Sequence, residues 1–120
     1  CPLESVTYMN AHATSSVLGD QVEVDAIKKV FGGRIKDLMI NSTKGLTGHC
    51  LQAAGGVEAA ATLIQLRNGF LHPSLNLRQP IDNECQFVGP TACEREVDVA
   101  MCNGFGFGGI NTSLVIKRVS

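Results

Sequence analysis

Residues 51–66, LQAAGGVEAAATLIQL, are almost all small or apolar. A helix that is apolar on every side is buried on every side, so this stretch predicts one central buried helix, which Asn68 and Gly69 end. Gly55 and Gly56 should each destabilise such a helix by about 1 kcal/mol relative to alanine. We therefore expect another backbone to lie very close to these two glycines.

On the N-terminal side of this helix, the sequence alternates between strand and helix patterns. Residues 5–10 have the β-branched and aromatic bias of a strand, and residues 38–41 are a short apolar run typical of a buried strand. Between them, Asp20 and Glu23 have the spacing of a capping box. They are expected to open an amphipathic helix that ends at the glycine pair of residues 32–33.

On the C-terminal side, an extended linker containing Pro73 and Pro80 comes first. Residues 86–88, 97–101 and 112–119 then predict three further strands. The order strand, helix, strand, helix and strands predicts an α/β fold in which helices cover a mixed sheet in layers. Because an apolar strand opens the sequence almost at residue 1, we expect the chain to begin in the middle of a fold.

The composition argues against several classes of function. Ten basic and eleven acidic side chains leave a net charge of −1, which disfavours nucleic acid or an anionic membrane as the main partner. No apolar run approaches the roughly 18 residues that a membrane span needs. The five cysteines form no CxxC pair, and no Cys/His group has zinc-site spacing. We therefore expect reduced thiols, a cytoplasmic location and no metal site.

Three predicted loops at strand ends hold the polar residues from which a site could be built. The first contains His12, the second contains Lys44 and His49, and the third is the segment NGFGFGG, residues 103–109. His49 stands just before the buried helix, whose positive dipole end favours a neutral imidazole. Either histidine alone could be structural, but two neutral imidazoles that meet at one oxygen atom would form an oxyanion hole.

Lys44 and Glu58 are predicted to form an ion pair. Glu58 is the only charged residue between Lys44 and Arg67, and a lone carboxylate on a buried helix is costly unless a cation pairs with it. The pair could be purely structural, or it could also orient His49 and tune the electrostatic potential of the site.

The third loop is a weak signal by itself. It has neither the lysine of a Walker motif nor Rossmann spacing, so it does not indicate a nucleotide site. Phe105 and Phe107 alternate with its glycines, which suggests a flexible hinge whose aromatic side chains gate an apolar tunnel.

Taken in order, the motifs of these loops and of the buried helix resemble those of the β-ketoacyl-acyl-carrier-protein synthases. The matching stretches are NAHATSS with GD after it, TKGLTGH, AAG with Glu58, and NGFGFGG. They run in register along nearly all of the sequence and cover only the C-terminal half of such an enzyme. The resemblance therefore implies that residues 1–120 are a C-terminal ketosynthase subdomain of the thiolase-like fold, whose two similar halves stack around a central buried helix pair.

The activity that this resemblance implies is a decarboxylative Claisen condensation of an acyl thioester with malonyl-acyl carrier protein, in fatty acid or polyketide synthesis. By position, His12 and His49 resemble the two catalytic histidines, Lys44 the active-site lysine and Glu58 its ion-pair partner. The sequence does not distinguish the two pathways or fix the chain length of the acyl group.

Further positions match residues that contact the substrate. The phosphopantetheine arm would accept hydrogen bonds near Thr14 and Ser16, and Phe105 resembles a gating phenylalanine beside the nucleophile, with Gly104 and Phe107 in the same loop. No cofactor is implied, because phosphopantetheine arrives on the acyl carrier protein. The other implied partners are the N-terminal half of the ketosynthase and a second subunit, in a homodimer or a ketosynthase heterodimer.

The family's nucleophilic cysteine belongs to the N-terminal half, so this chain alone should not condense anything. Cys93, in the triplet TAC, imitates the nucleophile motif, but Glu94 follows it and we do not assign it as the nucleophile. Three departures from the family pattern remove no catalytic group. Ala13 replaces the commoner glycine, Gly104 stands where serine is usual, and Gln52 replaces a glycine.

Three other interpretations stay open at this point. A degradative thiolase shares the Gly48-His49 pair and a cysteine–glycine pattern at Cys102, but thiolases do not combine His12 with a motif of the Lys44 type. Some ketosynthase homologues lack the nucleophile and act as a chain-length partner subunit. An isolated folding fragment would expose a large apolar patch where its other half docks.

Overall fold

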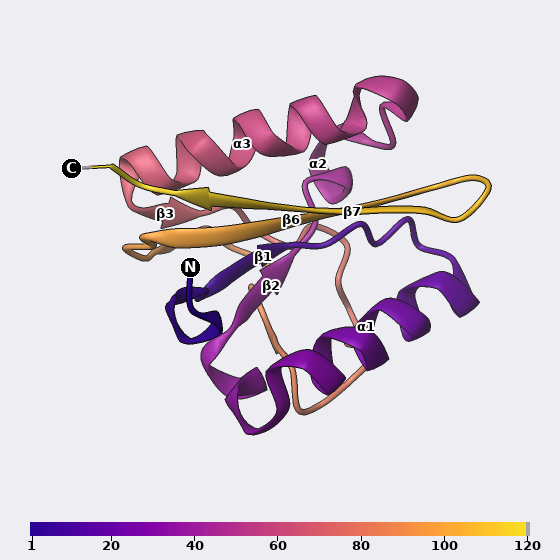
Figure 1. Ribbon diagram of the computed structural model, residues 1–120, viewed down its shortest axis with the longest axis horizontal. Helices are drawn as coiled ribbons and strands as arrows, with labels where there is room; N and C mark the ends of the chain where they lie inside the picture. The colour runs from indigo at the N-terminus through magenta and orange to yellow at the C-terminus, as the bar shows by residue number, and fades with distance from the viewer. Residues whose placement is uncertain (120) are drawn as a thin grey trace.

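The computed structural model describes residues 1–119, which form three layers with a five-stranded sheet between two helices (Figure 1). Across the sheet the strand order is β4-β2-β1-β6-β7. The parallel strands are β4 (Gln86–Phe87), β2 (Met39–Asn41), β1 (Tyr8–Asn10) and β6 (Val99–Gly106). Strand β7 (Ile110–Lys117) is antiparallel to β6. The predicted α/β fold with a layered mixed sheet is confirmed.

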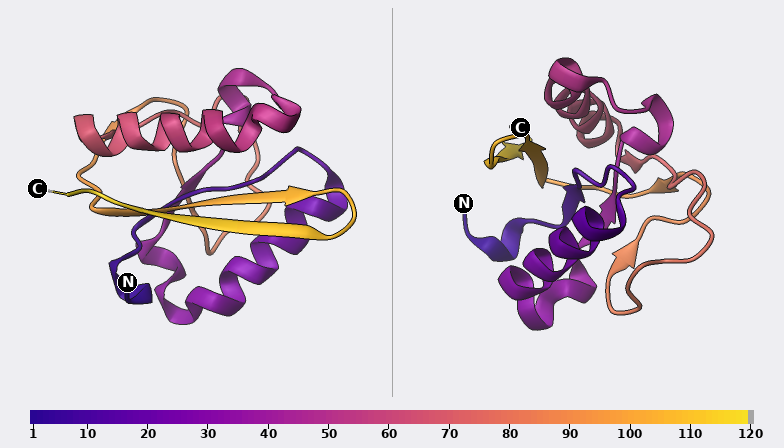
Figure 2. Two further views of the ribbon diagram at one scale, coloured as in Figure 1. Left: turned by 45° about the horizontal axis from the view of Figure 1, so that its top comes forward. Right: turned by 90° about the vertical axis from the view of Figure 1, so that its right-hand side faces the viewer.

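Helix α1 (Val17–Phe31) covers one face of the sheet and α3 (Ala54–Asn68) covers the other, as the views of Figure 2 also show. A second, antiparallel sheet pairs β3 (Phe70–Leu71) with β5 (Cys93–Glu94). The short elements are η1 (Leu3–Ser5), η2 (Gly32–Asp37), α2 (Lys44–Thr47) and η3 (Leu51–Ala53). Within residues 1–119, no helix has the length and apolar character needed to cross a membrane.

Side chains of β1 supply a separate core on each face of the sheet, because successive residues of a strand point to opposite faces. Met9 belongs to the cluster that contains Ile27 and Phe31 of α1. Tyr8 belongs to the cluster that contains Leu66 of α3. Both helices are therefore anchored on the same short strand, and the carboxyl end of that strand is held between them.

Helix α1 begins at Val17 and not at Asp20, so the predicted capping box is wrong. The N-cap residue is Ser16, whose side chain makes no capping hydrogen bond. Asp20 and Glu23 lie inside the helix, because it begins one turn earlier at Val17 and continues through Gly19. The end of the helix is as predicted, since Gly32 takes a positive φ of 54° and its N–H donates to the carbonyl of Lys28.

The expectation that the central helix is buried on all sides is wrong for the described chain. Leu51, Leu63 and Ile64 are 68%, 54% and 56% exposed, and a Cβ built on Gly55 or Gly56 would meet no atom within 4 Å. The face of α3 that lies on the sheet is buried, and it carries Ala54, Glu58, Thr62, Gln65 and Leu66. Within residues 1–119, α3 thus presents an apolar outer face, which includes Leu63 and Ile64, that no other element covers.

The glycine-rich segment is largely a strand and not a loop. Strand β6 continues through Asn103 to Gly106, and β7 starts at Ile110, so only the turn between them is irregular. Gly108 and Gly109 occupy that turn with φ values of 81° and 82°, which favour glycine. The predicted strands at residues 97–101 and 112–119 are therefore parts of one longer hairpin.

Candidate active site

The predicted site residues gather at the carboxyl ends of neighbouring strands. His12 follows β1, Lys44 follows β2, and Phe105 lies near the end of β6. These strands are parallel and adjacent, with β1 in the middle, so their carboxyl ends meet at one edge of the sheet. That edge is where open α/β sheets build their sites.

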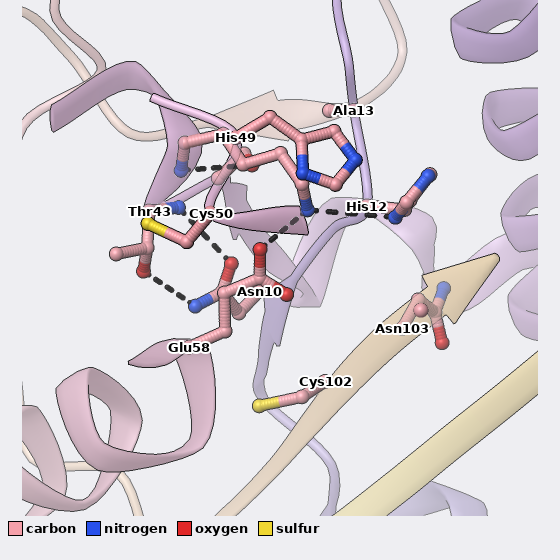
Figure 3. Close-up of polar contacts among 12 residues, drawn as sticks. Asn10, His12, Ala13, Thr43, His49, Cys50, Glu58, Cys102 and Asn103 are labelled. Atoms are coloured by element: carbon pink, nitrogen blue, oxygen red, sulfur yellow. Dashed lines mark hydrogen bonds and ion pairs between the residues drawn. The ribbon is translucent and has the colours of Figure 1, made fainter. Parts of the chain in front are cut away.

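The rings of His12 and His49 lie edge to face, with their centroids 5.9 Å apart and their planes at 87° (Figure 3). Nδ1 of His49 accepts a hydrogen bond from the backbone N–H of Leu51 at 3.0 Å. Nδ1 of His12 accepts one from the backbone N–H of Phe105 at 3.3 Å. A neutral imidazole that accepts at Nδ1 carries its proton on Nε2, so each ring keeps one N–H donor for another partner.

The surroundings of His12 favour its neutral form. Partial burial lowers the pKa of His12 below its ordinary value, and the positive charge of Lys44 lowers it further. The carboxylates of Glu23 and Glu58 act in the opposite direction but with smaller effect. His12 is therefore a neutral hydrogen-bond donor at physiological pH.

Lys44 and Glu58 form the predicted ion pair beneath the histidines. Both side chains are buried, and Lys44 Nζ contacts Glu58 Oε1 directly. Lys44 Nζ also lies 3.4 Å from Nδ1 of His12. The pair therefore satisfies two buried charges and at the same time places a cation beside one of the two imidazoles.

Glu23 belongs to the site and was not recognised as a site residue from the sequence. Its buried carboxylate accepts hydrogen bonds from the backbone N–H groups of His12 and Ala13, both at 2.9 Å, and from Nδ2 of Asn103 at 3.1 Å. Ala13 has a φ of 32°, so Glu23 holds a strained turn in place. The sequence does indicate that Glu23 faces the core, because it lies four and eight residues before two apolar core residues of α1.

Replacing Glu23 with glutamine is expected to lower any activity that depends on His12 by about tenfold, since misplacement of a catalytic group by 1 Å can cost up to about a hundredfold. Glutamine has a single side-chain oxygen and cannot accept hydrogen bonds at both positions. The measurement is the rate of the His12-dependent step, with Glu23→Asp as the matched variant that keeps the charge but shortens the side chain. A Glu23→Gln rate equal to that of the unmodified protein would contradict the assigned position of Glu23.

The residues predicted to contact substrate differ in how exposed they are and in how close they lie to the histidines. Phe105 is partly buried and its ring centroid is 5.2 Å from that of His12. Thr14 and Ser16 are exposed on the loop after β1, with their hydroxyl oxygens 3.4 Å apart. Gly104 faces Thr112 across the hairpin, where a Cβ would lie 2.9 Å from the Thr112 hydroxyl. Phe107 is fully exposed at the tip of the hairpin.

A cavity of about 660 Å³ opens beside this cluster, and its wall includes Thr14, Glu23, Lys44 and His49. In the part of the chain that the structure describes, no three His, Cys, Asp or Glu side chains gather in a way that could hold a metal ion. All five cysteines are free thiols, and Cys85 and Cys102 are buried. Cys93 lies on β5 in the second sheet.

Comparison with known proteins gives consistent matches. The family model described as "Beta-ketoacyl synthase, C-terminal domain" matches residues 1–78. The chain is 50% identical over 111 residues to 3-oxoacyl-[acyl-carrier-protein] synthase I, chloroplastic, of Arabidopsis thaliana, covering 91% of this chain and 23% of that protein. It is 44% identical over 118 residues to 3-oxoacyl-[acyl-carrier-protein] synthase 2 of Coxiella burnetii, covering 97% and 28%.

A solved structure gives a similar result for the fold. This solved structure, AntDE:AntF, is a type II PKS acyl-carrier protein in complex with its ketosynthase bound to the hexaketide. It superposes on this chain with a TM-score of 0.90, and the two sequences are 32% identical. The superposition covers 98% of this chain and 29% of that one. The chain thus spans about a quarter of the length of the curated relatives that it matches.

Proposed function

The chain belongs to the β-ketoacyl synthase family through its C-terminal domain, and on that premise we propose that it provides the decarboxylating part of a 3-oxoacyl-[acyl-carrier-protein] synthase. The reaction is the condensation of an acyl thioester with malonyl-acyl carrier protein, in fatty acid or polyketide synthesis. The single observation that carries this proposal is the pair of neutral imidazoles, His12 and His49, each with a free Nε2–H and with ring centroids 5.9 Å apart.

In the proposed reaction, the thioester carbonyl oxygen of the malonyl group accepts hydrogen bonds from both Nε2–H groups. The bond between the α-carbon and the carboxylate breaks, carbon dioxide leaves, and the electron pair moves onto the thioester oxygen as an enolate. Two donors held in fixed positions stabilise this developing negative charge without reorganisation. The enolate carbon then attacks the acyl thioester on the nucleophilic cysteine and expels the thiolate.

Lys44 and Glu58 are assigned a supporting role. The Lys44 ammonium beside His12 Nδ1 opposes protonation of that ring, and so keeps it a donor at Nε2 only. The Glu58 carboxylate fixes Lys44 in its buried position. Thr14 and Ser16 are proposed to hydrogen-bond the phosphopantetheine arm that the carrier protein brings, and Phe105 to gate the approach to His12; no further cofactor is proposed.

The nucleophilic cysteine is proposed to come from an N-terminal half outside residues 1–120, which would make these residues one subdomain of a complete synthase. Two observations support this arrangement. The relatives are about four times longer than the chain, and α3 exposes an apolar face that includes Leu63 and Ile64. An acyl carrier protein, a second subunit in a homodimer or ketosynthase heterodimer, and a cytoplasmic location remain predictions.

The test is to assay the complete synthase with malonyl- and acyl-carrier proteins, measuring carbon dioxide release and the 3-oxoacyl product separately. Both products together are expected. Carbon dioxide without condensation would indicate a nucleophile-less partner subunit. Cleavage of acetoacetyl-CoA in place of either reaction would indicate a thiolase and overturn the proposal.

A further inference from the structure

A buried polar network lies directly behind the proposed active site, and the mechanism above does not use it. Its centre is His72, whose residue surface is only 6% exposed. We propose that His72 is a positioning residue that fixes Thr43, and through it Lys44, by accepting a hydrogen bond from the Thr43 hydroxyl. The inference rests on the proposed function, because it concerns the same lysine.

The neighbours of His72 determine which of its nitrogens carries the proton. Nδ1 lies 3.0 Å from the carbonyl oxygen of Pro73, and a carbonyl can only accept. Nδ1 is therefore the protonated nitrogen, and Nε2, 3.1 Å from Thr43 Oγ1, is an acceptor. Asn41 Nδ2 also lies near Nδ1 at 3.2 Å, but it has a proper acceptor in the backbone oxygen of His72 at 2.8 Å.

The Thr43 hydroxyl is held from the other side by Asn10. Asn10 Nδ2 donates to Thr43 Oγ1 at 2.6 Å, and the Thr43 backbone N–H donates to Asn10 Oδ1 at 3.1 Å. The hydrogen bonds therefore run in one direction, from the Asn10 amide to the Thr43 hydroxyl and on to His72 Nε2. Because every partner in this chain is buried, a missing acceptor could not be replaced freely by water.

This chain of hydrogen bonds joins the ends of the two strands that carry the site. Asn10 is the last residue of β1, which leads into His12, and Thr43 immediately precedes Lys44. A shift of the Thr43 backbone would move the Lys44 ammonium away from His12 Nδ1, which is 3.4 Å away. Burial lowers the pKa of His72 below its ordinary value, consistent with a ring that acts here as a neutral acceptor.

The first experiment measures carbon dioxide release from malonyl carrier protein by the complete synthase. His72→Leu is expected to lower kcat about tenfold while KM stays within about twofold, because substrate contacts are unchanged. His72→Gln, whose side-chain oxygen can accept from Thr43, is expected to recover part of that loss. Tyr8→Phe is the matched control, because Tyr8 bonds Asn41 and Gln65 in the same buried network and makes no hydrogen bond to Thr43.

A double-variant cycle tests the route through the hydroxyl. If His72 acts by way of Thr43, the kcat of Thr43→Val combined with His72→Leu will be no lower than that of Thr43→Val alone. Additive losses in the double variant, an unchanged kcat in His72→Leu, or an equal loss in Tyr8→Phe would each overturn the proposal.

A second measurement requires no activity and separates this proposal from the proposed function. Nitrogen-15 NMR of histidine-labelled synthase reports which ring nitrogen of His72 is protonated, and Nδ1 is expected. A proton on Nε2 would overturn the role of His72 whatever the enzyme does. If Nδ1 is protonated but the unmodified enzyme releases no carbon dioxide, the proposed function fails while the Thr43–His72 hydrogen bond stands.

Discussion

Replacing His12 or His49 with alanine is expected to lower carbon dioxide release from malonyl carrier protein about 10²–10³-fold, the usual effect of removing one donor from an oxyanion hole. Each variant leaves a single Nε2–H for the enolate oxygen. Neither change removes the nucleophile, so acyl transfer from carrier protein to the cysteine should fall far less.

The two activities are measured on the same preparation of complete synthase, with labelled acyl carrier protein for loading and labelled malonyl carrier protein for decarboxylation. Loading serves as the internal control for folding. If loading and decarboxylation fall by equal factors in both variants, the histidines do not have the roles assigned here.

Replacing Lys44 with methionine is expected to lower the free energy of unfolding by about 3–5 kcal/mol, because the Glu58 carboxylate is then left buried without its cation. Lys44 is 9% exposed and Glu58 is 3% exposed, so water cannot take over the lost contact. The measurement is a denaturant titration of the complete synthase in which the slope of the transition is checked to be unchanged.

The matched variant for this test is Lys44→Met combined with Glu58→Leu, which removes both charges at similar volume. The double variant is expected to regain most of the lost free energy of unfolding, since replacing a buried ion pair with an apolar pair of similar volume changes stability little. A double variant as unstable as the sum of both single variants would mean that the two side chains are not coupled. Decarboxylation should remain low in either case, because the cation beside His12 is gone.

Much of the site could be predicted because several of its interacting residues lie close together in the sequence. The Lys44–Glu58 pair followed from one carboxylate on an apolar helix and one nearby cation. The proximity of His12 and His49 depends in addition on the parallel pairing of β1 with β2, which a strand–helix–strand pattern predicts. Their tautomers depend on hydrogen bonds from the backbone N–H groups of Leu51 and Phe105, which form only in the folded structure.

Other features depend on partners that lie far apart in the sequence, and these partners could not be predicted. Glu23 matches a capping box, yet it bonds the loop after β1 and Asn103, which is 80 residues away. The glycine-rich segment NGFGFGG looked like a loop, but pairing with β7 makes residues 103–106 a strand. His72, next to Pro73 in what was assigned to a linker, gains its partners only when β2 and α3 come together.

A crystal structure of the complete synthase with a malonyl-thioester analogue that cannot lose carbon dioxide would show directly whether both histidines bind the thioester oxygen. We expect the thioester oxygen to lie about 3 Å from Nε2 of both His12 and His49, with Nδ1 of each ring still bound to its backbone N–H. A thioester oxygen bound by only one of these rings, or held by backbone amides elsewhere, would contradict it.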